Sequence, residues 1–189
     1  MKKLSLLLVF AALQTAVFAQ GAWKLDKMHA HLKFTVSHLS VSDVDGNFTD
    51  FDVTINTNKA DFSDARFALT IKAASVNTGV DMRDNDLRSD HFFNVATYPT
   101  ITFTGAVAGV TSPGHYKLSG NLTMHGVTKP VTMDLWYRGT ITNPMTKAPD
   151  AGFKLTGTLK RSDFGIAPSY PAAMIGDDIA IEAGGEFHQ

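Results

Sequence analysis

Cysteine is absent from the 189 residues of the chain. This absence excludes thiol nucleophiles, iron–sulfur clusters, zinc sites built on cysteine, and disulfide bonds. It also excludes a lipid anchor attached through cysteine. A chain without disulfide bonds depends on its hydrophobic core for stability, and about 170 residues are enough for one sizeable core.

Long apolar runs are also missing, except at the N-terminus. Lys2 and Lys3 precede an apolar run that starts at Leu4 and ends at Ala19. A basic start, a short apolar middle and a cleavage site of small residues are typical of a secretory signal peptide. We therefore predict a signal peptide over 1–19 and one domain over 20–189, which is periplasmic or secreted. No later segment reaches the roughly 20 apolar residues of a membrane helix, so we expect the mature chain to be soluble.

Charge of one sign is not in excess, since the chain has 17 basic and 18 acidic residues. Loss of Lys2 and Lys3 with the signal peptide would leave a net charge of about −3. A slightly acidic chain has neither the basic surface of a nucleic-acid binder nor a polybasic patch for anionic lipid. We expect no nucleic-acid partner. The sequence leaves the assembly state open, a homodimer included.

Alternation of apolar and polar residues recurs between turn signals along most of the chain. This period of two places one set of residues on one face, as in half-buried strands. The pattern predicts about eight strands, with a turn at Asp45-Gly46-Asn47 after the first and a short helix between Thr78 and Thr97. The predicted strands include the segments 31–38, 51–55, 67–73, 101–103, 116–124, 131–137, 153–159 and 179–183.

The predicted fold class is all-β: a single antiparallel barrel of eight strands with a short helix. Closure into a barrel removes both edges of a sheet at once, and eight strands can either fill the interior or leave room for one small ligand. A two-sheet sandwich is the alternative that the same alternation permits.

Two histidines and two charged segments are the candidates for chemistry. His29 and His31 lie two apart, and in a strand their rings would share a face and could hold a metal, but no third ligand is evident. The segment 82–93 could bind an anionic head group, although an Asp84–Arg88 pair would also stabilise a helix. The segment 160–165 is typical of a salt-bridged corner. No nucleophile and base stand at a recognisable spacing, so we predict no catalytic residue, no metal and no enzymatic activity.

Several motifs follow one another along the chain at consistent spacing. They are Trp23-Lys24-Leu25-Asp26 with His29, then Phe34, Val36 and His38, Gly46-Asn47-Phe48, Arg83-Asp84, Leu87-Arg88-Ser89, Phe92-Phe93, Tyr98-Pro99 with Ile101-Thr102-Phe103, Gly120-Asn121-Leu122-Thr123, Gly126-Val127-Thr128-Lys129-Pro130-Val131, Arg161, Asp163-Phe164-Gly165 and Gly176-Asp177. Together these motifs resemble the YceI-like family of exported, lipocalin-like polyisoprenoid-binding proteins. The resemblance covers nearly the whole mature chain and departs from the family at Asp86, His91, Asn94 and Pro168-Ser169.

The resemblance implies an extended barrel whose apolar cavity takes a polyisoprenoid, an isoprenoid quinone or a fatty amide, with no other cofactor. We predict that the following residues bind this lipid: Phe34, Val36, His38, Leu69, Ile71, Arg83, Phe92, Ile101, Phe103, Leu122, Met124, Met133, Leu135, Phe153, Leu155 and Ile179. His38 and Arg83 would meet the head group. Two alternatives stay open, a hydrolase that uses a histidine-bound metal and a quinone-bearing partner of a membrane redox system.

Overall fold

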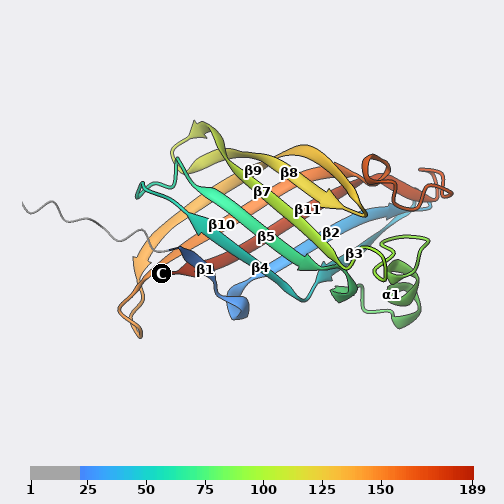
Figure 1. The fold of residues 1–189 in the computed structure, drawn as a ribbon, viewed down its shortest axis with the longest axis horizontal. Coiled ribbons are helices and arrows are strands. Elements are labelled where there is room, and N and C mark those ends of the chain that lie inside the picture. Colours follow the sequence, from blue (N-terminus) through green and yellow to red (C-terminus); the bar gives the residue numbers. More distant parts are fainter. Residues whose placement is uncertain (1–21) are drawn as a thin grey trace, which may run out of the picture.

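The computed structural model describes residues 22–189, and the predicted signal peptide lies outside this range. Eleven antiparallel strands form one sheet in the order β1-β4-β5-β7-β8-β9-β10-β11-β2-β3-β6, and β1 also pairs with β11. That pairing closes a ring of eight strands, and β2, β3 and β6 continue the sheet from β11. The prediction of an all-β barrel with one short helix is confirmed (Figure 1).

The strands before the helix are short. They are β1 (Trp23–Leu25), β2 (His31–His38), β3 (Ser42–Phe48), β4 (Phe51–Asn56), β5 (Arg66–Lys72) and β6 (Val76–Asn77), with the 3-10 turns η1 (Lys27–His29) and η2 (Ala73–Ser75) between them. The helix α1 spans Asp81–Arg88.

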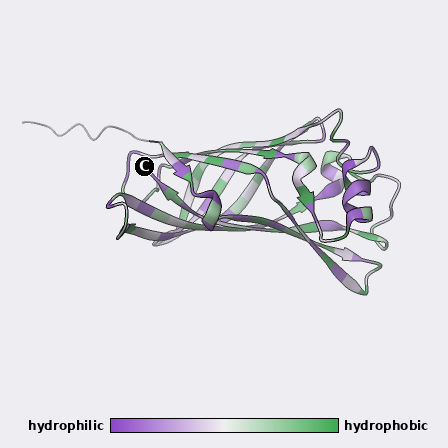
Figure 2. Cartoon of the chain, turned by 90° about the horizontal axis from the view of Figure 1, so that it is seen from below, coloured by the Kyte–Doolittle hydropathy of each residue, from purple (hydrophilic) through white to green (hydrophobic). Residues whose placement is uncertain are grey.

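The strands after the helix are longer and form most of the wall. They are β7 (Thr100–Ser112), β8 (His115–Met124), β9 (Val127–Thr142), β10 (Pro149–Lys160) and β11 (Ile175–His188), with the 3-10 turn η3 (Arg161–Phe164) after β10. Figure 2 shows hydrophobic and hydrophilic residues alternating along these strands, and a largely hydrophilic α1 at one end of the barrel. Within residues 22–189, no helix has both the length and the apolar character to span a bilayer.

The predicted turn at Asp45-Gly46-Asn47 is wrong, because these residues lie inside β3. The chain turns earlier, and Leu39 and Ser40 both have positive φ. Position 46 requires glycine because the ring of Phe34 lies over it, and a Cβ there would be 2.3 Å from the ring. The glycine therefore makes room for a core side chain, a role that sequence does not distinguish from a turn.

One end of the barrel is filled with aromatic side chains. Phe62, 1 % exposed, lies in the loop between β4 and β5. Its ring centroid is 5.2 Å from that of Trp23, 4.8 Å from that of Tyr137 and 5.0 Å from that of Phe153. Such edge-on and tilted contacts are the favoured geometries of packed rings. We call Trp23, Phe62, Tyr137 and Phe153 the aromatic plug, and it leaves this end of the barrel solid.

Candidate functional site: two apolar chambers in the barrel

An inner chamber of about 170 Å³ lies in the barrel. Its walls come from most of the strands, and their inward side chains are apolar because of the alternation described above. Nine of the predicted lipid-binding residues line it: Phe34, Leu69, Ile71, Ile101, Phe103, Leu122, Met124, Met133 and Leu155. Lys33 is the one charged residue in this lining. The inner chamber can therefore offer a ligand dispersion contacts but few hydrogen bonds.

An outer chamber of about 110 Å³ lies between the barrel and the segment that contains α1. Predicted residues Val36, Phe92 and Ile179 line it, together with Leu87 and Phe93 from the helical segment. The rings of Phe48 and Phe93 are 5.7 Å apart, which joins the helical segment to β3. The inward side chains Leu87, Phe92 and Phe93 therefore make the inner face of this segment apolar, and we call the segment the apolar lid over this end of the barrel.

A partition separates the two chambers. It consists of the residues that line both of them, namely Phe34, Phe48, Met124, Leu159 and Ile181. Phe34 and Phe48 are in ring contact at 5.9 Å. Met124 is unbranched and has three rotatable bonds, so it can turn aside at low cost. Movement of these side chains would join the chambers into one elongated cavity.

Four predicted residues do not line either chamber. Phe153 belongs to the aromatic plug and Leu135 is buried in the core. Arg83 donates from Nε to the Thr78 hydroxyl at 2.7 Å and from Nη2 to the Thr78 carbonyl at 3.0 Å. His38 is exposed at the end of β2, where it pairs with Ile175 of the outer chamber. Of the two predicted head-group residues, only His38 adjoins a chamber. Arg83 instead binds Thr78, which precedes α1.

The expected Asp84–Arg88 pair is not formed. Asp84 is buried and accepts hydrogen bonds from the Thr78 amide at 2.8 Å and the Thr78 hydroxyl at 2.6 Å. Arg88 instead donates to the carbonyls of Ala74 at 2.8 Å and Val76 at 2.7 Å. Asp84 thus ties α1 to Thr78, which follows β6, and Arg88 ties it to η2 and β6. The apolar lid is thus tied to the barrel by local polar contacts.

Arg161 has a role that the sequence did not indicate. The predicted salt-bridged corner is wrong for this residue, which is buried and, among residues 22–189, donates to five backbone carbonyls. The acceptors are Gly176 at 3.2 Å, Ile166 at 3.1 Å, Ala167 at 2.7 Å, Tyr170 at 2.6 Å and Ile175 at 3.0 Å. Lys160 makes the salt bridge instead, with Asp178 at 2.7 Å. Arg161 therefore fixes the loop between η3 and β11, and both Ile166 of this loop and Ile175 at the start of β11 line the outer chamber.

Other residues of the chamber walls were also missed. Phe48 was overlooked because it follows the supposed turn, and Ile166 and Ile175 because they lie outside the alternating runs. Ile181 and Ala183 alternate as expected of one strand face and could have been included from that signal. The alternation finds wall residues in strands, but not those contributed by loops.

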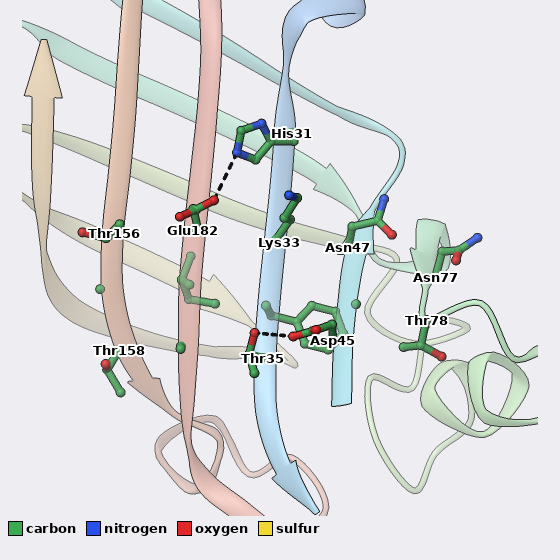
Figure 3. Close-up of a pocket in the computed structure, with 15 residues that line it drawn as sticks. His31, Lys33, Thr35, Asp45, Asn47, Asn77, Thr78, Thr156, Thr158 and Glu182 are labelled. Carbon is green, nitrogen blue, oxygen red and sulfur yellow. Dashed lines mark hydrogen bonds and ion pairs between the residues drawn. The ribbon is translucent and has the colours of Figure 1, made fainter. Parts of the chain in front are cut away.

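A polar hollow lies on the outside of the sheet, across β10, β11, β2 and β3 (Figure 3). Its side chains bond to one another: Thr35 donates to Asp45 at 2.6 Å, and His31 lies 3.7 Å from Glu182. The hollow is open, and its lining mixes charged and hydroxyl groups with apolar ones, so it suits an apolar ligand less well than the largely apolar walls of the two chambers. The two apolar chambers are the better candidates for binding.

The two histidines considered for a metal site do not face each other from one strand. His29 lies in η1, where its Nδ1 is 2.8 Å from a carboxylate oxygen of Asp26. The hydrogen bond with Asp26 raises the pKa of His29, and the same bond lowers the pKa of Asp26. Asp26, His29 and Glu186 have ligand atoms within 4.8 Å of one another. The Asp26 carboxylate also accepts from the Met28 amide at 2.9 Å, so Asp26 caps the start of η1 and these contacts have a structural role.

Comparison with known proteins gives the family. A model of the YceI-like domain matches residues 23–187. UPF0312 protein SAB2563 from Staphylococcus aureus (strain bovine RF122 / ET3-1) is 37% identical over 166 residues, which are 86% of this chain and 94% of that protein.

Solved structures agree with the fold. The YCEI protein of Campylobacter jejuni has a TM-score of 0.74 at 34% identity, over 81% of this chain and 89% of that one. A polyisoprenoid binding domain from Saccharophagus degradans has a TM-score of 0.65 at 21% identity, over 88% of this chain and 97% of that one. Burkholderia cenocepacia BcnA has a TM-score of 0.74 at 21% identity, over 86% of this chain and 98% of that one. The chain therefore belongs to the YceI-like family.

Proposed function

We propose that this protein binds the apolar tail of an amphipathic lipid, of the polyisoprenoid, isoprenoid-quinone or fatty-amide kind, and carries or sequesters it outside the cytoplasm. The two adjoining apolar chambers carry this proposal, and the description of the Saccharophagus degradans neighbour as a polyisoprenoid binding domain supports it. Each CH₂ group buried from water contributes roughly 0.8 kcal/mol, so a few isoprene units offset the cost of immobilising a chain.

The volumes constrain how such a tail would enter. Ligand pockets usually measure about 300–1,000 Å³, and the two chambers together fall below that range. The inner chamber alone is close to an apolar cavity of about 150 Å³ that admits a benzene-sized molecule. A long tail would therefore occupy both chambers and displace the partition. In this arrangement the tail end lies toward the aromatic plug and the head group lies at the lid end.

The side chains that line the two chambers suit binding of a lipid better than catalysis. The chamber linings hold apolar side chains with Lys33, Lys160 and Arg161, and Arg161 already bonds to backbone carbonyls. Among the residues that the structure describes, the two linings contain no carboxylate, hydroxyl or imidazole group, which are the usual general acids, bases and nucleophiles of hydrolases. The lining thus supports retention of a ligand without chemical change.

A pair of alanines on β11 allows a direct test. Ala183 lines the inner chamber, whereas Ala180 is exposed on the outer face of the same strand. Ala183→Phe should fill much of the inner chamber and weaken binding of a dansylated farnesyl probe at least tenfold, which corresponds to about 1.4 kcal/mol. Ala180→Phe is the matched control and should bind as the parent does.

The readout is probe fluorescence, with thermal unfolding of each variant as the check on folding. Equal affinity of the folded Ala183→Phe variant and the parent would show that the probe does not enter the inner chamber, and the proposal would be wrong.

The partition gives a second test, of tail length. Met124→Ala removes the most flexible member of the partition and should join the chambers. We expect the variant to gain affinity for a longer geranylgeranyl probe relative to the farnesyl probe. An unchanged preference would show that Met124 does not limit the length of the bound tail.

A further inference from the structure

Two neighbouring loops at the lid end expose a cluster of apolar side chains. Val41 is 83 % exposed, Leu39 is 49 % exposed and Met174 is 44 % exposed. The residues from Pro171 to Met174 are all exposed, and a run of consecutive exposed apolar residues is unusual unless it has a function. We call Leu39, Val41 and the run 171–174 the apolar tip.

The two loops form one surface. The Leu39 amide donates to the Met174 carbonyl at 2.8 Å, and the Ser40 hydroxyl donates to the Ala173 carbonyl at 3.4 Å. Figure 1 shows the β2–β3 turn beside the loop that leads into β11, at the same end of the barrel as α1. Arg161 holds the base of the second loop through its five carbonyl contacts. Hydrogen bonds therefore hold the two loops of the apolar tip in a fixed arrangement.

The turn itself is unfavourable for the residues that occupy it. Leu39 and Ser40 have φ of 53° and 56°, a combination found in type I′ turns, which strongly prefer Asn-Gly. A branched apolar residue in this conformation is strained and is also exposed here. Strained positions tend to occur at functional sites. An exposed leucine at such a position points to contact with an apolar partner.

Charge is absent from both loops. Residues 36–42 and 164–176 contain no Asp, Glu, Lys or Arg. A surface that enters hydrocarbon must avoid charged groups, whose burial is costly. Next to these loops, Val36 near the end of β2 and Ile175 at the start of β11 line the outer chamber, as does Ile166 of the second loop. The apolar tip therefore adjoins the outer chamber.

We propose that the apolar tip docks on a lipid bilayer, so that the outer chamber opens against the membrane and a tail passes between them without crossing water. The transfer step rests on the proposed function, whereas docking itself does not. Binding would depend on insertion of apolar side chains and not on attraction to anionic head groups.

Flotation with vesicles of phosphatidylcholine, whose zwitterionic head group has no net charge, tests the proposal. We expect the parent protein to float with the vesicles, and to do so equally in about 1 M salt, where charges are screened beyond about 3 Å. The double variant Val41→Asp, Met174→Asp should bind about 100-fold more weakly, because burial of each apolar side chain is worth at least about tenfold. The control is Met145→Asp, since Met145 is 91 % exposed in the loop between β9 and β10 at the other end of the barrel. It should float as the parent does.

Three outcomes would overturn the proposal. One is a parent protein that is absent from the floated fraction at every vesicle concentration, and another is a Met145→Asp variant that loses as much binding as the double variant. The third is a double variant that keeps vesicle binding but loses a dimer seen in sedimentation, which would assign the apolar tip to a second copy of the chain.

The farnesyl probe separates this proposal from the proposed function. A double variant that retains the probe but does not float supports docking as a separate step. A parent that floats but does not bind the probe keeps the docking proposal and contradicts lipid carriage.

Discussion

Removal of the Arg161 side chain should destabilise the loop that bears the apolar tip. The guanidinium donates five hydrogen bonds to backbone carbonyls, and two of the acceptors, Ile166 and Ala167, belong to buried residues. In Arg161→Ala, water can reach the three acceptors nearer the surface, but the two buried carbonyls lose their partner. Each unsatisfied buried carbonyl costs about 1–3 kcal/mol, which gives a loss of about 2–6 kcal/mol in the free energy of unfolding.

This loss is large compared with the whole stability of a domain, about 5–15 kcal/mol. Arg161→Lys should lose less, because the ammonium keeps the charge and three donors. Arg138→Ala is the matched control, since Arg138 is exposed and its guanidinium carbon lies 5.1 Å from the centre of the Trp136 ring. An exposed cation–π contact is worth about 0.5–1 kcal/mol, so the control should lose no more than that.

Urea unfolding measures these differences, provided that the slope of free energy against denaturant is the same for all variants. Hydrogen exchange should show faster exchange in the loop between η3 and β11 for Arg161→Ala alone. If Arg161→Ala loses no more stability than Arg138→Ala, the five contacts are not stabilising and the reasoning is refuted.

Two smaller predictions concern the wall and a surface ion pair. Gly46→Ala should lower the free energy of unfolding by about 1–3 kcal/mol, because the new Cβ would push against the Phe34 ring. Gly109→Ala is the control, since a Cβ there meets open space, and it should be near neutral in the same unfolding assay. Equal losses of stability in the two variants would contradict the contact. His29 should titrate in NMR above its ordinary pKa of about 6.5, and Asp26→Asn should bring the midpoint back down. Because the pKa of folded His29 is raised, its small stabilising effect should be complete below about pH 6.5 and fade as the pH rises through the raised value. A midpoint that Asp26→Asn does not change would show that the pair is not formed.

Most of the wall could be predicted from the sequence because strand alternation is a local property. Phe103 and Leu122 lie opposite each other on neighbouring strands and face the inner chamber, as the period of two requires. The position of the first turn could not be predicted, since Gly46 in a strand and Gly46 in a turn look alike. The place of Phe153 in a solid plug depends on Phe62, which a loop brings to the same end of the barrel.

The partners of polar side chains were harder to predict from the sequence than the residues of the wall. Arg83, Arg88 and Arg161 each bond to backbone carbonyls, and no sequence pattern indicates which carbonyls a fold leaves free. Charge spacing suggested side-chain pairs for Arg88 and Arg161, and both pairs are absent from the described residues. The head-group contacts stay a prediction for the same reason, because they depend on which polar groups the folded chain leaves without partners.

Native mass spectrometry, followed by organic extraction of the protein purified from its own host, tests the central claim most directly. Two adjoining apolar chambers predict one bound molecule per chain, with a mass and fragmentation typical of an isoprenoid or other long apolar tail. The Ala183→Phe variant should lose that mass, and the Ala180→Phe variant should keep it. A parent protein that carries no such molecule from its host, and that binds none when isoprenoid lipids are supplied, would contradict the account.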